Sequence, residues 1–186
     1  MDNGASSYRR YLDGDDQGIA EIVEEYRVRL MLYLNGFVGN YSVAEELTEE
    51  TFFRLITKKP RFSGRSSFYS FLCSIGRNVA VDHLRKHGRI AATPVEEMAD
   101  YLADGEELER VYLRKERNVI LYRAMQDLAV DYRAVLWLSF FEGLSNREVA
   151  TALSKSERQV KNLLYRAKQS LKIKLEKEGF AYENIG

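Results

Sequence analysis

The sequence has little cysteine, little proline and no strand-like segments. Cys73 is the single cysteine in 186 residues, so a disulfide within the chain is excluded and a reducing compartment such as the cytoplasm is expected. Long stretches of helix-forming residues lie around the two prolines, Pro60 and Pro94. Because no segment alternates Val, Thr or Ile as a strand would, the sequence predicts an all-α protein.

Apolar runs long enough to cross a membrane are also missing. A span requires roughly 18 consecutive apolar residues, and no run approaches that length. The N-terminus is polar and acidic, without the apolar core of a signal peptide. We therefore expect a soluble, intracellular chain, whose ordinary apolar content is enough for a packed core.

The charges cancel to a formal net of +0 but are segregated along the chain. Residues 1–50 hold eleven acidic and four basic residues, a net of −7, whereas residues 51–89 hold nine basic residues and one acidic residue, a net of +8. Residues 155–177 hold eight basic and two acidic residues, a net of +6. Because solvated helix faces usually mix the two signs, these two blocks predict two separate nucleic-acid contacts.

The C-terminal third of the chain carries two helix-start signals. Ser145 with Glu148, and Ser156 with Gln159, have the spacing of a capping box. Apolar residues recur at helical spacing after each box, which predicts a short helix, a turn and a longer second helix. Such a helix-turn-helix is suited to the major groove of DNA, whereas the alternative is a plain helical hairpin with a solvated charged face. The candidate DNA-contacting residues are Ser156, Glu157, Arg158, Gln159, Lys161, Asn162, Tyr165, Arg166 and Lys168.

Helical periodicity predicts three helices before residue 89. The first is expected from Gln17 to Phe37, after a frayed polar segment in which Tyr8 and Tyr11 could still dock. The second is expected to begin at a capping box of Ser42 with Glu45 and to stop before proline. Acidic residues in its first turns suit the helix dipole but could equally form a patch for a basic partner protein, and the sequence leaves both interpretations open.

The third helix is expected to begin with a cap at Ser66 and to run to about Gly88, after a Gly/Ser loop. A basic face with interleaved aromatic residues beside such a loop is typical of single-stranded nucleic-acid binding, because cations follow the phosphates and rings stack on bases. The alternative is that most of these aromatic residues belong to the core. The candidate residues of this contact are Arg61, Phe62, Ser63, Arg65, Ser66, Ser67, Tyr69, Arg77, Asn78, Arg85 and Lys86.

Residues 89–115 are predicted to connect two small helical domains. This stretch is strongly acidic and has few large apolar residues, so a flexible linker is expected. Helical apolar spacing resumes at about Arg117 and gives the C-terminal unit enough residues for its own small core. The expected organisation is therefore a domain at 1–88, a linker, and a helix-turn-helix domain at 116–180.

In this order of parts the chain resembles the extracytoplasmic-function (ECF) group of bacterial RNA polymerase sigma factors, within the sigma-70 superfamily, over nearly its full length. The most specific stretch is RFSGRSSFYSFLCSIGRNVAVDHLRK, where Arg77-Asn78 and Asp82-His83-Leu84-Arg85 follow the family's order and spacing. The matching stretches on either side of it are AEELTEETFFRL, and AVLWLSFFEGLSNREVATAL with VKNLLYRAKQSLK.

The resemblance implies a sigma factor that directs promoter-specific transcription initiation. Its region 2-like domain would melt the −10 element and hold the non-template strand, and its region 4-like domain would bind the −35 element. The expected partners are core RNA polymerase, through its β′ and β subunits, promoter DNA and an anti-sigma factor. No cofactor is implied, and polymerisation belongs to the core enzyme. The residues expected to dock on the β′ coiled coil are Glu46, Leu47, Glu49, Glu50 and Phe53.

Three positions depart from the family's pattern. Ser154-Lys155 stands where a small residue and an aliphatic residue are usual, which removes an apolar anchor from the turn. Arg158 and Gln159 replace smaller residues, so a −35 preference particular to this chain is expected. Leu128-Ala129 stands where Leu-Pro is usual before region 4, which leaves that helix boundary open.

Two other functions fit parts of the sequence. A stand-alone helix-turn-helix regulator would explain the C-terminal domain but not the basic block at 51–89, and no sustained heptad seam for a dimer is present. His83 and His87 beside Asp82 could suggest a metal-dependent enzyme, but no third ligand follows and the neighbouring basic residues would repel a cation. Cys73 lies on an apolar helix face, where a core role is favoured over a nucleophile.

Overall fold

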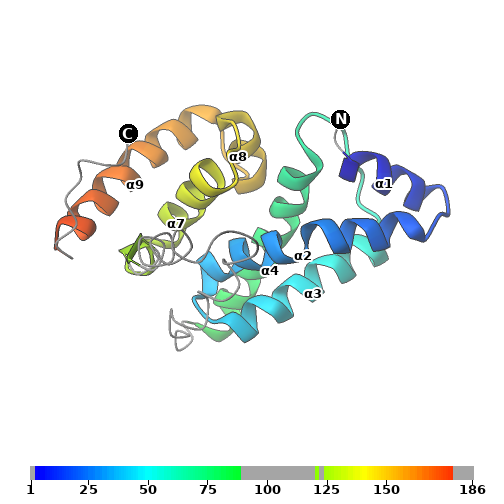
Figure 1. Cartoon of the computed structure of the whole chain (residues 1–186), viewed down its shortest axis with the longest axis horizontal. Coiled ribbons are helices and arrows are strands. Elements are labelled where there is room, and N and C mark those ends of the chain that lie inside the picture. Colours follow the sequence, from blue (N-terminus) through cyan, green and yellow to red (C-terminus); the bar gives the residue numbers. More distant parts are fainter. Residues whose placement is uncertain (1–2, 89–119, 122–123, 178–186) are drawn as a thin grey trace, which may run out of the picture.

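The computed structural model describes residues 3–88, 120–121 and 124–177. The helical elements are α1 (Asn3–Leu12), α2 (Gln17–Val38), α3 (Tyr41–Lys58), α4 (Phe68–His87), α7 (Val130–Leu136), the π-helix η1 (Trp137–Phe141), α8 (Asn146–Leu153) and α9 (Glu157–Lys177). Figure 1 shows α1 to α4 in one half of the molecule and α7 to α9 in the other. The described residues contain no strand, so the all-α prediction is confirmed. The expected linker, 89–115, lies outside them.

None of the helices in the described ranges combines the length and the apolar character needed to pass through a bilayer.

The helix ends in the first half follow from glycine, asparagine and serine. Gly39 ends α2 in the left-handed region, with φ 65°, and its N–H donates to the carbonyl of Asn35 at 2.8 Å. The expected cap of α3 at Ser42 is wrong: the extended residue Asn40 is the N-cap, and its side chain accepts from Val43 N at 3.1 Å. Because the connection from α2 is short, α3 begins two residues earlier than predicted.

The cap of α4 also lies one position from the expected one. Ser67, and not Ser66, is the N-cap, and its Oγ accepts from the backbone N–H of Ser70 at 3.3 Å. The adjacent residues Ser66 and Ser67 offer the same hydroxyl, and the cap is the one that directly precedes the first helical residue, Phe68. The far end agrees with the prediction, because Gly88 ends the helix.

The N-terminal segment is a docked helix, so the expected fraying is wrong. Tyr8 is only 1% exposed, and its hydroxyl donates to the carbonyl of Pro60 at 2.7 Å. The hydroxyl of Tyr11 donates to the carbonyl of Ile56 at 3.1 Å. Two tyrosines therefore anchor a polar helix to the end of α3, because each combines a large apolar ring with a satisfied donor.

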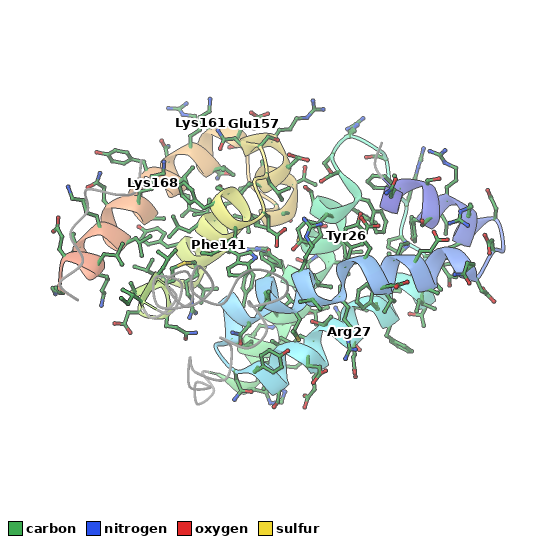
Figure 2. All side chains as sticks on the ribbon, viewed as in Figure 1. Tyr26, Arg27, Phe141, Glu157, Lys161 and Lys168 are labelled. Atoms are coloured by element: carbon green, nitrogen blue, oxygen red, sulfur yellow. The ribbon has the colours of Figure 1, made fainter. Side chains whose placement is uncertain are left out.

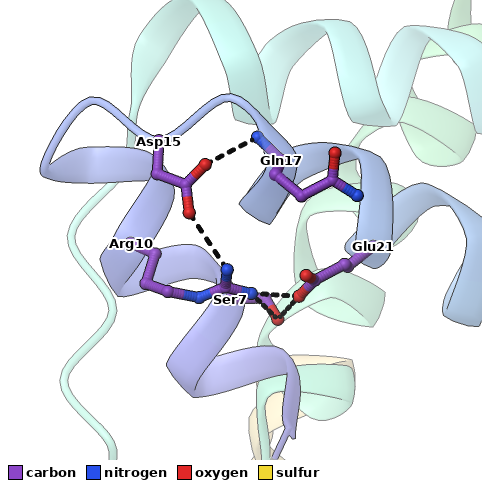
Figure 3. Close-up of polar contacts among 5 residues, drawn as sticks. All are labelled: Ser7, Arg10, Asp15, Gln17 and Glu21. Carbon is purple, nitrogen blue, oxygen red and sulfur yellow. Dashed lines mark hydrogen bonds and ion pairs between the residues drawn. The ribbon is translucent and has the colours of Figure 1, made fainter.

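A polar network closes the corner between α1 and α2 (Figure 3). Arg10 bridges Asp15, at 3.0 Å, and Glu21, which also accepts from the hydroxyl of Ser7 at 2.6 Å. The two helices cross at Gly18, where a Cβ atom would lie 2.2 Å from the backbone oxygen of Ser7. Only glycine allows so close a crossing.

The first half packs α2, α3 and α4 around a shared core. Leu30 and Leu34 of α2 and Leu55 of α3 are fully buried, and α4 contributes Leu72. Gly76 of α4 brings the helices together, since a Cβ there would lie 3.2 Å from each of the α2 leucines. This scaffold holds α4 in one orientation, and the part of its remaining face that α8 does not cover is open to solvent.

The second half is a helix-turn-helix on a short helical base. The buried residues Leu138 of η1, Val149 and Leu153 of α8, and Val160 and Ala167 of α9 share one core. That core is continuous with the core of the first half, because α8 packs on α4 and α7 packs on α2. Figure 1 shows α8 next to the start of α4.

Candidate nucleic-acid interface

Both predicted capping boxes form. Ser145 is the N-cap of α8. Its Oγ accepts from the backbone N–H of Glu148 at 3.3 Å, and its own backbone N–H donates to the Glu148 carboxylate at 2.9 Å. Ser156 and Gln159 exchange the equivalent pair at the start of α9, at 3.2 and 2.8 Å. The two boxes define the starts of both helices in a helix-turn-helix. They also tie the side chains of Ser156 and Gln159 into the cap.

The turn between the helices is held by an ion pair. Ser154 adopts the left-handed conformation, with φ 54°, and ends α8. The ammonium of Lys155 then lies 3.1 Å from the carboxylate of Asp131 in α7. The usual aliphatic anchor of this turn is therefore replaced by a charged contact to the helix below.

The outer face of α9 is a solvent-exposed surface of donors. All nine side chains predicted to contact DNA, from Ser156 to Lys168, are exposed, and Tyr165 is 67% exposed. Within the described part of the chain, Arg158, Lys161 and Arg166 have no ion pair that would occupy their charge. Figure 2 shows Lys161 on the outer side of α9, away from α7.

One cation on this face is held by an aromatic ring that the sequence analysis did not single out. The ammonium of Lys168 lies 5.0 Å from the ring centre of Phe140 in η1, and Phe140 is itself 57% exposed. A cation over an aromatic face is attracted to the ring's negative quadrupole. The only signal in the sequence was an aromatic pair, Phe140-Phe141, directly before the first capping box.

The loop before α4 presents cations beside a packed aromatic ring. Arg61, Ser63 and Arg65 are exposed. Phe62 is half-buried, with its ring centre 5.6 Å from that of Phe68 and 5.2 Å from that of Phe71. The loop therefore offers charge to a ligand, while its aromatic residue serves in part as a core residue.

The open face of α4 carries Asn78, Arg85 and Lys86, all exposed as expected. Arg85 is paired with Asp82 at 3.3 Å on its own helix. Arg77 is half-buried, and its Nε atom has no hydrogen-bond partner among the described residues. These exposed residues lie in the second half of α4, whereas the exposed cations of the loop precede its start.

Tyr69 is not on this open face, so its predicted position is wrong. The residue is 3% exposed and its ring is stacked on that of Tyr26 of α2, with 5.6 Å between centres and 18° between planes. Burial raises the pKa of its phenol well above the ordinary value. The position lies where α4 meets both α2 and the second half of the molecule, which the helical spacing alone could not indicate.

The residues predicted to bind core polymerase divide between the surface and the core. Glu46, Glu49 and Phe53 share one exposed face of α3, and Phe53 is 61% exposed. Leu47 is 5% exposed and belongs to the core, so its predicted surface position is wrong. Glu50 is half-buried and accepts from Arg54 at 2.6 Å.

An apolar groove beside this face was missed by sequence reasoning. Ile19, Val23, Val28 and Ile56 line it between α2 and α3. Val28 is 49% exposed and Ile56 is 37% exposed. In the sequence, the groove could have been indicated by Val28, which is an apolar residue outside the buried stripe of its helix.

The residues considered for other chemistry lie in ordinary structural surroundings. Cys73 is fully buried, and burial raises the pKa of its thiol, as a core role predicts. The rings of His83 and His87 lie 4.6 Å apart, and burial and then His87 lower the pKa of His83. No group of three or more metal-ligating side chains occurs in the described ranges.

Two family models match the chain in the order of its two basic surfaces. The model of sigma-70 region 2 matches residues 22–90, and the model of sigma-70 region 4 matches residues 118–171. The RNA polymerase sigma-H factor of Pseudomonas aeruginosa is 30% identical over 166 residues, which cover 85% of this chain and 86% of that protein. The ECF RNA polymerase sigma factor SigX of Bacillus subtilis is 31% identical over 162 residues, which cover 83% of this chain and 82% of that protein.

The fold is shared with a solved sigma factor structure. The sigma factor RpoE of Bartonella quintana, solved in complex with the anti-sigma factor NepR, matches with a TM-score of 0.64 at 19% identity, over 84% of this chain and 96% of that one. Fold and matched regions define a two-region transcription initiation factor. The chain belongs to the ECF group of RNA polymerase sigma factors. It therefore works by binding and is not an enzyme.

Proposed function

We propose that this sigma factor binds core RNA polymerase in the cytoplasm and directs initiation through two DNA contacts of different kinds. The α9 surface binds the −35 element as a duplex, and the loop with α4 holds the melted −10 strand. The observation that carries this proposal is the presence of two separate exposed basic surfaces, one on each matched region. The proposed domain boundaries are 1–88, 89–115 and 116–180.

The −35 contact follows from the geometry of a recognition helix. Residues in the first turns of such a helix contact base edges in the major groove, and later residues contact phosphates. Arg158 and Lys161 occupy the first turns of α9 and are exposed. Lys168, held over Phe140, is placed two turns further along for a phosphate. Because Ser156 and Gln159 are engaged in the cap, Arg158 carries most of the base discrimination.

The −10 contact combines phosphate attraction with room for a displaced base. Arg61 and Arg65 of the loop and Arg85 of α4 form a basic path for the strand backbone. Extruding a base costs a few kcal/mol, and one stacked base recovers about 1–3 kcal/mol. Asn78 lies on the same open face and supplies both a donor and an acceptor for a base edge.

The contact with core polymerase lies on a different side of the first domain. Glu46, Glu49 and Phe53 form an acidic face with one exposed aromatic ring, next to the groove at Val28 and Ile56. An aromatic anchor within a charged rim is the usual composition of a protein–protein contact. The proposed occupant of this surface is the coiled coil of the β′ subunit of core polymerase, and an anti-sigma factor is the proposed regulator.

The proposal is tested by comparing duplex and pre-melted promoter templates with reconstituted holoenzyme. Asn78→Ala should reduce open-complex formation on the duplex by more than on a template whose −10 region is already unpaired. Gln169→Ala, an exposed amide on α9 outside the proposed contacts, is the matched control. Binding to core, measured by gel filtration, should be unchanged in both variants. Equal losses on both templates would assign Asn78 a folding role and contradict the melting function of α4.

A further inference from the structure

The N-terminal helix α1 precedes the part of the chain that the sigma-70 region 2 model matches, yet it is bonded to the proposed −10 surface. Residues 59–67, which connect α3 to α4, form the −10 loop of that surface. The hydroxyl of Tyr8 donates to the carbonyl of Pro60 at 2.7 Å, and the hydroxyl of Tyr11 donates to the carbonyl of Ile56 at 3.1 Å. Two side chains of α1 therefore hold the backbone where the loop begins.

The bond from Tyr11 replaces one that proline removes from α3. In an α-helix the N–H of each residue donates to the carbonyl four positions earlier. The residue four positions after Ile56 is Pro60, which has no N–H to donate. The hydroxyl of Tyr11 supplies the missing donor, so a side chain of α1 completes the last turn of α3.

The residue at which the chain leaves α3 is also held by α1. Lys59 is the C-cap and has φ 43°, in the left-handed region that glycine usually occupies. Its ammonium lies 4.8 Å from the ring centre of Tyr11, and attraction to the ring helps to offset the cost of that conformation. The direction in which the loop starts thus depends on Tyr11.

The ring of Tyr8 lies behind the aromatic part of the loop. Its centre is 5.3 Å from that of Phe68 and 6.1 Å from that of Phe71, and Phe62 of the loop packs on the same two rings. Burial raises the pKa of Tyr8 to about 12, so its hydroxyl stays protonated and remains a donor. The loop is therefore supported by α1 on its core side, while its two arginines stay exposed.

We propose that α1 is part of the −10 contact, and that Tyr8 and Tyr11 are positioning residues that hold the −10 loop ready for the melted strand. A loop that is free to move loses conformational entropy when a ligand orders it, which weakens binding, and a loop held by α1 loses less. Both tyrosines are buried, so they act through the loop and not by touching the strand. The inference rests on the proposed function, because it extends the same loop site to a helix outside the matched region.

Tyr8→Phe tests the proposal because it removes only the hydroxyl and keeps the buried ring. The ligand is a fluorescent oligonucleotide with the non-template −10 strand of a promoter that wild-type holoenzyme transcribes. Holoenzyme with Tyr8→Phe should bind it about fivefold more weakly than the wild type, the effect of one hydrogen bond between neutral groups. The slope of log affinity against log salt should stay unchanged, because no cation that contacts a phosphate has been removed.

Two further variants are compared with this one. Tyr33→Phe is the matched control, because Tyr33 of α2 is also fully buried but its hydroxyl has no hydrogen-bond partner among the described residues. Its affinity for the strand should equal that of the wild type. Arg61→Ala removes a proposed phosphate contact from the loop itself. It should weaken binding and also lower the salt slope by about 0.7, the value for one phosphate of a single strand.

Limited proteolysis of the free full-length chain measures the mobility of the loop directly. Trypsin cleaves after the exposed residues Arg61 and Arg65 when the loop opens locally. Cleavage there should be about fivefold faster in Tyr8→Phe than in the wild type, because the rate follows the population of the open form. Cleavage after Lys161, within α9, should be unchanged. The rates are compared at a temperature at which circular dichroism shows both chains fully folded.

The outcomes are distinct. The role of α1 is overturned if Tyr8→Phe binds the strand as tightly as the wild type, or if its loop is cleaved at the wild-type rate. An equal loss of affinity in Tyr33→Phe would also overturn it, because the effect would then not depend on the bond to the loop. If Arg61→Ala leaves strand binding unchanged, or if wild-type holoenzyme does not bind the strand, the proposed −10 function of the loop fails instead.

Discussion

Replacing Arg158 by alanine tests the duplex contact with little disturbance of the fold. Arg158 lies in the first turn of α9, is exposed, and has no ion pair within the described part of the chain. A substitution at such a surface position usually changes the free energy of unfolding by no more than about 0.5 kcal/mol. Any larger effect of Arg158→Ala must therefore come from a ligand.

The expected size follows from the chemistry of the guanidinium. A bidentate contact from arginine to a guanine edge contributes about 1–3 kcal/mol of discrimination. Its loss corresponds to roughly 5- to 150-fold weaker binding of the −35 duplex. If Arg158 instead contacts a phosphate, binding should weaken for all sequences, and the slope of log affinity against log salt should fall by about 0.9.

The assay is equilibrium binding of holoenzyme to a duplex promoter fragment selected from a genomic library by the wild-type protein. Salt is varied, and a fragment with a scrambled −35 element is measured in parallel. Lys177→Ala removes the same charge from the same helix, about 28 Å away at a rise of 1.5 Å per residue. This control should behave as the wild type.

Equal affinities of Arg158→Ala and Lys177→Ala for the selected promoter would refute a role of Arg158 in the duplex contact. Loss of core binding by Arg158→Ala would also refute that role, because the side chain would then act on the polymerase contact or on folding. A loss confined to the intact −35 element would assign Arg158 to base recognition.

Three further predictions concern the fold that positions these surfaces. Gly18→Ala should release α1, because its Cβ would meet a backbone oxygen at 2.2 Å, and should lower the free energy of unfolding by about 1–3 kcal/mol, with faster proteolysis in α1. Gly36→Ala, where a Cβ meets nothing within 4 Å, should instead be neutral or stabilising by up to about 1 kcal/mol. Leu153→Ala, at a site 1% exposed, should lower the free energy of urea unfolding by about 2–5 kcal/mol, and a loss below 1 kcal/mol would contradict its core position. Because burial and then His87 lower the pKa of His83, the folded state favours the neutral ring, so stability is full above about pH 6.5 and falls as the pH drops toward the folded pKa. Thermal unfolding of His83→Gln should therefore depend less on pH between 7.5 and 5.5 than that of the wild type, and an unchanged dependence would count against this account.

Features set by residues close in sequence were predictable. The capping boxes at Ser145 and Ser156 need only two side chains three positions apart, and both form. The end of α2 at Gly39 needs only a residue that tolerates a positive φ. The caps at Asn40 and Ser67 were missed because several neighbouring residues offer equivalent acceptors, and the path of the connecting chain selects one.

Features that depend on distant contacts were not predictable from spacing. Tyr8 docks α1 through a hydrogen bond to the carbonyl of Pro60, 52 residues away. Tyr69 is buried with its ring stacked on Tyr26 of α2 and with Arg29 over it, and Arg29 pairs with Glu142, 113 residues away. The exposed surface of α9 was predictable because a long helix with one apolar stripe leaves its other face open.

The most direct test of the central claim is run-off transcription with purified bacterial core polymerase on genomic promoter fragments. Adding this chain should produce transcripts with defined start sites from a small set of fragments, and the chain should elute with core polymerase on gel filtration. The absence of both the complex and any promoter-specific transcript would contradict the sigma factor account. DNA binding that persists without core would then point to a stand-alone helix-turn-helix regulator.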